Sequence, residues 1–164
     1  MNYGKAQMGG NICYVFMDGK IHKILLNSIP PDDLILERNG KADEIAENVI
    51  KWIEFGKVFS YPCAVTGTPF QQKVYQMIQE IPKGKVTTYK IVAEKMGTKS
   101  YRAVGQALGA NPIPLLIPCH RVIGSDRRLT GFGGGIDLKK KILRAEGVDF
   151  EGEKVKKEYI LREI

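Results

Sequence analysis

Two short runs near the N-terminus are rich in β-forming residues. They cover residues 11–15 and 21–26, and the dipeptide Asp18-Gly19 lies between them. Asp-Gly between two such runs is a strong signal for a tight hairpin turn. The pattern therefore predicts two paired strands at the start of the chain.

Apolar residues at helical spacing follow the hairpin, over residues 42–55. They recur every three or four positions, which is the period of one helix face. The members of this face are Ile45, Val49, Trp52 and Ile53. Gly56 stands near the end of the run, where a helix C-cap is expected. Residues 59–68, which include Pro62 and Gly67, then predict a linker.

Three helices are predicted after the linker, and each has a capping residue before its first turn. A Thr or Ser at this position can accept a bond from a free backbone N–H, and proline is favoured directly after it. The caps are Thr68, Thr88 and Ser100, and the helices end near Pro82, Gly97 and Gly109. The last two helices, joined by a short turn with a glycine, are a candidate helix-turn-helix.

The rest of the chain is expected to mix extended, loop and helical segments. Asn111-Pro112-Ile113-Pro114 stops the preceding helix because residues before proline avoid the helical conformation. The later predictions are an extended segment at 115–122, a glycine-rich loop at 129–135, a helix at 138–144 and an amphipathic helix at 154–164.

The expected fold class is therefore α/β. A small N-terminal domain of sheet plus helix, residues 1–62, precedes a mostly helical domain, residues 63–164, that contains the helix-turn-helix. The longest apolar run, residues 12–17, is too short for a membrane span or a signal peptide. A soluble, cytoplasmic protein without membrane partners is the resulting expectation.

Positive charge is concentrated in the second of these domains. The chain has a net charge of +7, but residues 1–62 hold 7 Lys and Arg against 8 Asp and Glu. Residues 63–164 hold 18 against 10, which gives +8. A basic domain is typical of a protein that binds a polyanion such as DNA, although a lysine-rich solvated surface gives the same count.

The cysteines and histidines argue against structural bridges and metals. The chain has three cysteines, Cys13, Cys63 and Cys119, and no pair has CxxC spacing. An odd number without that spacing disfavours a disulfide framework and a zinc site. With only His22 and His120 available, we expect no metal.

Cys119 and its neighbour His120 are the candidates for chemistry. A thiol is a strong nucleophile only as thiolate, and its ordinary pKa of roughly 8.5 requires a base that removes the proton. Adjacent side chains on an extended strand point to opposite faces, so a water or a bend is needed to link the two. A buried structural cysteine is the alternative reading of Cys119.

Four motifs in this half of the chain resemble those of the O6-alkylguanine-DNA alkyltransferases. The motifs appear in the family's order and spacing, and the resemblance is dense from about residue 68 to residue 147. They are Arg102-Ala103-Val104-Gly105-Gln106-Ala107-Leu108, the run at 109–117, Pro118-Cys119-His120-Arg121-Val122 and Ala145-Glu146-Gly147.

This resemblance implies a function and a catalytic set. A family member removes an alkyl group from O6 of guanine in duplex DNA and transfers it irreversibly to its own cysteine, once per molecule, without a cofactor. Cys119 matches the acceptor. His120 matches the histidine that withdraws the thiol proton through a water, and Glu146 matches the glutamate that orients this histidine.

The resemblance also assigns residues to the base and to DNA. Tyr89 matches the tyrosine that gives a proton to N3 of guanine, and Asn111 matches the asparagine that braces the turn before the active-site segment. Arg102 matches the arginine that fills the stack after the nucleotide is flipped out. Small residues, Ala103 and Gly105, let this helix approach the minor groove, which departs from the usual use of the motif.

The pocket for the base is implied by backbone groups. In the family, carbonyls at the positions of Cys119 and Val122 receive the exocyclic amine, and an amide at the position of Gly133 contacts O6. Some members have Tyr-Ser where this chain has Phe132-Gly133, so a serine contact is absent here. Some members also bind zinc, but Met17 stands where a cysteine ligand is required.

The partner implied is double-stranded DNA that carries O6-alkylguanine, and we expect a monomer without an obligate protein partner. Three other functions stay open at this stage. They are a lesion sensor of the alkyltransferase-like kind, which lacks the reactive cysteine, a cysteine–histidine hydrolase, and a plain helix-turn-helix binding module with a buried Cys119.

Overall fold

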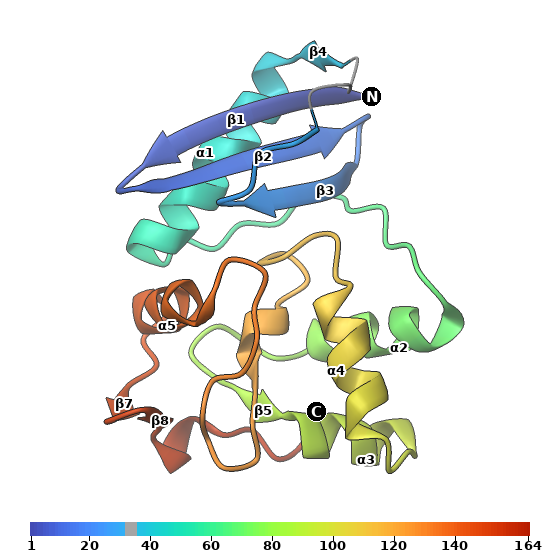
Figure 1. The fold of residues 1–164 in the computed structure, drawn as a ribbon, viewed down its shortest axis with the longest axis vertical. Coiled ribbons are helices and arrows are strands. Elements are labelled where there is room, and N and C mark those ends of the chain that lie inside the picture. Colours follow the sequence, from blue (N-terminus) through green and yellow to red (C-terminus); the bar gives the residue numbers. More distant parts are fainter. Residues whose placement is uncertain (32–35) are drawn as a thin grey trace.

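The computed structural model describes residues 1–31 and 36–164. A sheet with one helix across it forms one end of the molecule, and the other helices and short strands form the other end (Figure 1). A long segment without helix or strand leads from the first part to the second. The C-terminus lies near the short strand β5.

The sheet at the N-terminal end has four strands, in the order β3-β2-β1-β4. β1 pairs antiparallel with β2, β2 pairs antiparallel with β3, and β1 pairs parallel with β4. The bounds are β1 Asn2–Met8, β2 Asn11–Met17, β3 Ile21–Leu26 and β4 Glu37–Arg38. The predicted hairpin is confirmed as β2 and β3, whereas the mostly polar β1 and β4 were not predicted.

Helix α1, Gly40–Phe55, covers the sheet with the predicted apolar face. Asn39 caps its first turn by accepting bonds from the backbone of Lys41 and Ala42. Gly56 ends the helix with φ of 68°, a left-handed conformation that favours glycine. The helix packs closely on β1, where a Cβ on Gly4 would lie 2.1 Å from the backbone carbon of Ala42.

The three capped helices are confirmed. Thr68 forms a complete capping box with Gln71 at the start of α2, Pro69–Ile78. Thr88 caps α3, Tyr89–Met96, and Ser100 caps α4, Tyr101–Gly109. These helices pack against one another, so the caps fix where each helix begins relative to its neighbours.

The predicted extended segment at 115–122 is wrong. Its end is instead a 3-10 turn, Cys119–Arg121, followed by β6, Val122–Ile123, which pairs parallel with β5, Thr87–Thr88. Asn111 explains the difference, because its side chain donates to the carbonyl of Ile117 at 2.8 Å and accepts from the N–H of Ile113 at 2.9 Å. The segment is thereby folded back on itself.

The predicted C-terminal helix at 154–164 is also wrong. After α5, Ile136–Ala145, the chain forms a small antiparallel pair and a 3-10 turn. The last residues return to the core, where Leu161 donates to the carbonyl of Val86 at 2.7 Å. These elements are β7 Phe150–Glu151, β8 Lys154–Val155 and the turn Lys157–Tyr159.

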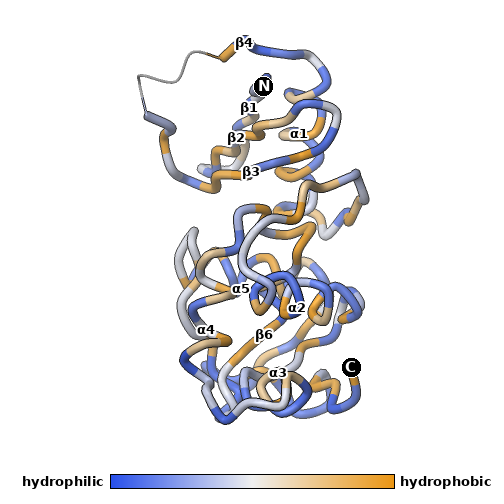
Figure 2. Tube along the Cα trace, turned by 90° about the vertical axis from the view of Figure 1, so that its right-hand side faces the viewer, coloured by the Kyte–Doolittle hydropathy of each residue, from blue (hydrophilic) through white to orange (hydrophobic). Residues whose placement is uncertain are grey.

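The main hydrophobic core runs through both ends of the molecule. It joins the inner face of the sheet and α1 to α2, α4 and the active-site segment. Hydrophobic positions recur along β2 and around β6 (Figure 2). No helix in the described ranges is both long and apolar enough to cross a membrane.

Candidate active site

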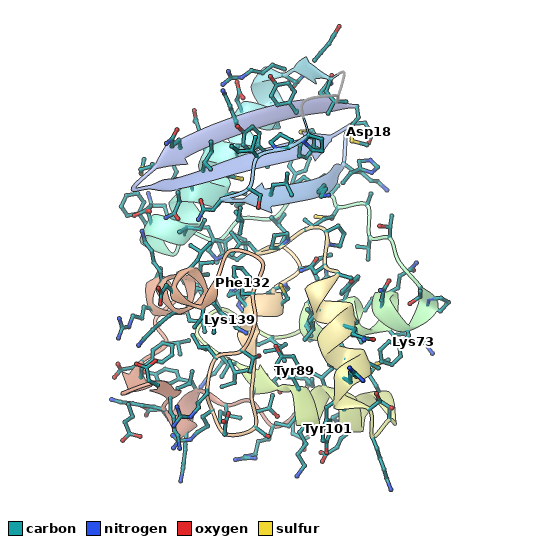
Figure 3. All side chains as sticks on the ribbon, viewed as in Figure 1. Asp18, Lys73, Tyr89, Tyr101, Phe132 and Lys139 are labelled. Atoms are coloured by element: carbon teal, nitrogen blue, oxygen red, sulfur yellow. The ribbon has the colours of Figure 1, made fainter. Side chains whose placement is uncertain are left out.

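A cavity of about 740 Å³ opens between β3, α4 and the glycine-rich loop. Most of the side chains assigned to the base and to DNA line this cavity, whereas His120, Glu146, Val122 and Ala103 do not. Figure 3 shows Tyr89, Phe132 and Lys139 in the region between α5 and α4. The predicted residues that line it are Tyr89, Arg102, Gly105, Asn111, Cys119, Phe132 and Gly133.

Behind the cavity, His120 and Glu146 form a fully buried pair. Glu146 follows directly after α5, and its Oε2 lies 2.9 Å from Nε2 of His120. The other ring nitrogen of His120, Nδ1, has no hydrogen-bond partner among the described residues. If Nε2 donates to the carboxylate, Nδ1 keeps its lone pair and is the basic atom of the ring.

The Glu146 carboxylate is held by two further side chains that the sequence did not single out. Arg121 donates from Nε to Oε1 and from Nη2 to Oε2, both at 2.9 Å. Trp52, from α1, donates its indole N–H to Oε2 at 2.7 Å. Arg121 also donates to the carbonyl of Ile81 at 2.8 Å. The buried negative charge is therefore fully compensated by donors.

These contacts keep Glu146 ionised, whereas burial favours the neutral form of His120. Burial raises the pKa of Glu146, but the bonds from His120 and Arg121 outweigh burial and lower this pKa to about 2. Burial lowers the pKa of His120, and the neighbouring Glu146 offsets that effect only in part. Because the positive charge of Arg121 compensates the Glu146 carboxylate, His120 does not need to be protonated and can accept a proton.

Cys119 is a half-buried residue that lines the cavity. Burial raises the pKa of this thiol, while the Asn111 side chain and the Lys139 ammonium act in the opposite direction. Its location at the start of the 3-10 turn, next to the buried His120, replaces the strand geometry expected from the sequence. The resting thiol therefore needs a base before it can act as a nucleophile.

Lys139, on α5, is a further buried charge that the sequence analysis missed. Its Nζ donates to the carbonyl of Val122 at 2.8 Å and to that of Thr130 at 3.3 Å. Burial lowers the pKa of Lys139 to about 8. The carbonyl of Val122, predicted to receive the guanine amine, thus already accepts one bond from Lys139.

Tyr89 lies at the start of α3 and its hydroxyl faces the glycine-rich loop. The Thr130 hydroxyl donates to the Tyr89 hydroxyl oxygen at 2.6 Å. Burial raises the pKa of Tyr89, and the bond from Thr130 opposes this rise. Because Tyr89 accepts this bond, its own proton is available to another acceptor in the cavity.

Helix α4 borders the cavity with a charged residue and a glycine. Arg102 is exposed in the first turn, and a Cβ on Gly105 would meet no atom within 4 Å. Ala103 is half-buried on the same helix but does not line the cavity. Tyr101, half-exposed at the start of α4, lines the cavity as well and was not predicted.

The N-terminal part of the chain supplies one wall of the cavity. Residues 23–26 from β3 and Ser28 line it opposite the glycine-rich loop. β3 is fixed there because Ile24 donates its backbone N–H to the carbonyl of Pro112 at 2.9 Å. No local signal in residues 21–28 indicates this role, which depends on how distant segments pack.

The described residues contain no group of three His, Cys, Asp or Glu side chains that could hold a metal ion. Met17 is buried in the core, where it packs as an apolar side chain. The arrangement around Cys119 therefore consists of a nucleophile, a buried base and hydrogen-bond donors.

Comparison with known proteins identifies similar chains. A family model described as the DNA-binding domain of 6-O-methylguanine DNA methyltransferase matches residues 69–148. A methylated-DNA–protein-cysteine methyltransferase of Haemophilus influenzae is 46% identical over 90 residues, which are 54% of this chain and 50% of that protein. The chain thus spans about half the length of the curated relatives that it matches.

Two solved structures extend the comparison. Mycobacterium tuberculosis OGT in complex with DNA has a TM-score of 0.78 and 29% identity, over 89% of this chain and 92% of that chain. S. pombe Atl1, in complex with damaged DNA containing O6-carboxymethylguanine, has a TM-score of 0.51 and 33% identity. That match covers 59% of this chain and 98% of the S. pombe chain.

Proposed function

The chain belongs to the family of 6-O-methylguanine DNA methyltransferases, and from this premise we propose that it repairs alkylated duplex DNA. The reaction is the irreversible transfer of a methyl or other alkyl group from O6 of guanine to Cys119. Each molecule acts once, without a cofactor, as a cytoplasmic monomer that needs no protein partner. Named as an enzyme, it is a methylated-DNA–protein-cysteine S-methyltransferase.

The observation that carries this proposal is the pairing of a cysteine that lines the cavity with a buried, neutral base. Cys119 lines the cavity, and His120 has one nitrogen on Glu146 and one buried nitrogen without a partner. A buried polar atom left unpaired is costly. A water between Nδ1 of His120 and the thiol would pair this atom and carry the proton.

The transfer step balances with the groups present. The thiol proton of Cys119 passes through the water to His120, and the sulfur forms a bond to the alkyl carbon. The bond between that carbon and O6 breaks, and its electron pair stays on guanine. During this step the Glu146 carboxylate stabilises the imidazolium of His120, and Arg121 stabilises that carboxylate. An acid oriented behind a histidine acts in the same way in related nucleophilic sites.

Tyr89 supplies the proton that neutralises the departing guanine at N3. Support comes from the direction of the Thr130 bond, which leaves the Tyr89 proton available and stabilises negative charge on the phenol oxygen. The backbone carbonyls of Cys119 and Val122 hold the exocyclic amine, Gly133 contacts O6, and Phe132 borders the base. Asn111 holds the segment that carries Cys119.

DNA binding is proposed for residues 63–164, with α3 and α4 as a helix-turn-helix. Residues 1–62 form the N-terminal domain, which closes one side of the cavity. Gly105 and Ala103 bring α4 close to the minor groove, and Arg102 enters the stack when the damaged nucleotide is flipped out. The charge of +8 on this domain supports contact with phosphates.

Label transfer tests the proposed function. The protein is incubated with duplex DNA that carries a labelled methyl group on guanine O6. We expect label on protein up to one methyl per chain, and none for Cys119→Ser, while the control Cys63→Ser behaves as wild type. Repeated turnover, or tight binding of the damaged duplex without label transfer, would refute the proposal.

A further inference from the structure

The C-terminal end of α1 is docked on the C-terminal end of α5. Lys141 and Glu54 form an ion pair with Nζ and Oε1 2.6 Å apart. Gly56 approaches so closely that a Cβ there would lie 2.0 Å from the carbonyl oxygen of Ala145. These contacts bring the last turn of α1 directly against Glu146, the residue after α5.

Because α1 and α5 are in contact here, the Trp52 side chain lies next to the buried Glu146 carboxylate. Its side chain is almost fully buried, at 3% exposure, and its indole N–H donates to Oε2 of Glu146 at 2.7 Å. The same oxygen accepts the bond from Nε2 of His120. The Trp52 ring also stands edge-on to the His120 ring, with centroids 6.2 Å apart and planes at 84°.

We infer that Trp52 is a positioning residue for alkyl transfer: its indole N–H fixes the Glu146 carboxylate in the orientation that accepts the proton on Nε2 of His120 and so leaves Nδ1 as the base. The inference rests on the proposed function. It also gives the N-terminal part of the chain a task in the reaction, because Trp52 lies 94 residues away from Glu146 in the sequence.

The physical reason is that the Trp52 indole N–H and Nε2 of His120 bind the same oxygen, Oε2 of Glu146. A charge-assisted donor lowers the negative charge that Oε2 offers to His120 and restricts rotation of the carboxylate. Without the indole N–H, the carboxylate is less restrained and more of the negative charge on Oε2 acts on His120. The His120 ring then becomes more basic, because the charge of Glu146 raises the pKa of His120, whereas the charges of Arg121 and Lys139 lower it.

Replacing one atom tests this role. Trp52 is the sole tryptophan of the chain, so growth on 3-benzothienylalanine exchanges its N–H for sulfur and changes no other residue. Single-turnover methyl transfer is then measured across pH. We expect a rate roughly ten-fold lower near neutral pH, and an acid limb displaced to higher pH because His120 becomes more basic.

A matched control separates positioning from packing. Phe59→Leu removes the aromatic ring that packs edge-on against Trp52, with centroids 5.8 Å apart, but leaves the bond to Glu146. This variant should keep the wild-type acid limb. An unchanged rate in the benzothienyl protein, or a lower rate with an unchanged acid limb, would overturn the inference.

A second readout does not depend on activity. The ¹⁵N-labelled indole gives a single side-chain resonance, which should shift clearly in Glu146→Gln because its acceptor loses its charge. A resonance that stays unmoved in this variant overturns the inference. If instead the wild type transfers no label, the proposed function fails, while the resonance still reports whether Trp52 is bonded to Glu146.

Discussion

Among single residues, Lys139 has the largest expected effect outside the nucleophile and its base. Its ammonium donates to the carbonyls of Val122 and Thr130 and opposes the rise that burial causes in the pKa of the Cys119 thiol. Lys139→Met keeps the length of the side chain but removes the charge and both bonds. We expect single-turnover transfer near neutral pH to slow by roughly ten- to a hundred-fold.

Lys140→Met is the control for this prediction. Lys140 follows on the same helix and contacts Phe150 rather than the cavity, so its loss should leave the rate unchanged. If Lys139→Met is folded and transfers alkyl at the wild-type rate, the ammonium does not support the thiol.

The pH dependence of transfer follows from His120. In the proposed mechanism the neutral ring is the base, so activity is present above its pKa and is lost as the pH falls through it. Burial places this pKa below the ordinary value of 6.5. We therefore expect the midpoint of the acid limb of the transfer rate to lie below pH 6.5. A midpoint at or above 6.5 would contradict the buried, neutral state of His120.

At the scale of elements, we propose that α4 makes the contacts that distinguish duplex DNA from the free modified base. Arg102 lies exposed in its first turn, at the rim of the cavity. Arg102→Ala should slow transfer from duplex DNA by roughly ten-fold or more, because flipping a nucleotide costs a few kcal/mol. Reaction with the free modified base should change little. Gln106→Ala, on the same helix, serves as control, and equal losses on both substrates would rule out a role in flipping.

Local signals predicted the helices well, because caps act within a few residues. Thr68, Thr88 and Ser100 each cap the helix expected of them. The 3-10 turn at Cys119 escaped prediction because it depends on Asn111 reaching the carbonyl of Ile117. The C-terminal segment has helical spacing, but its backbone bonds to Val86 and it forms only a 3-10 turn rather than an α-helix.

The candidate site shows the same division between local and distant information. The motifs place Cys119, Asn111 and Tyr89 around one cavity and bring His120 to Glu146. Trp52 and the wall from β3 were not predicted, because their contacts join segments far apart in the sequence. The charge of Lys139 gave no signal, since lysines on predicted helices are ordinarily exposed.

For the whole molecule, the uneven charge predicts how DNA binding responds to salt. Residues 63–164 carry +8 and residues 1–62 carry −1. Neutralising phosphates releases counterions, so affinity falls as salt rises. We expect affinity for unmodified duplex to drop by roughly ten-fold or more between about 50 and 200 mM salt. Titration by fluorescence anisotropy measures this, and a salt-independent affinity would contradict a phosphate-binding surface.

In the proposed reaction, Cys119 receives the alkyl group and keeps it. The chain contains two other free cysteines, Cys13, which is buried, and Cys63, which is half-buried, and burial raises the pKa of both. Peptide mapping by mass spectrometry, after reaction with excess O6-methylguanine duplex, locates the product. We expect one added methyl group per chain, on Cys119 alone. A methyl group on another residue, or an unmodified protein beside demethylated DNA, would contradict it.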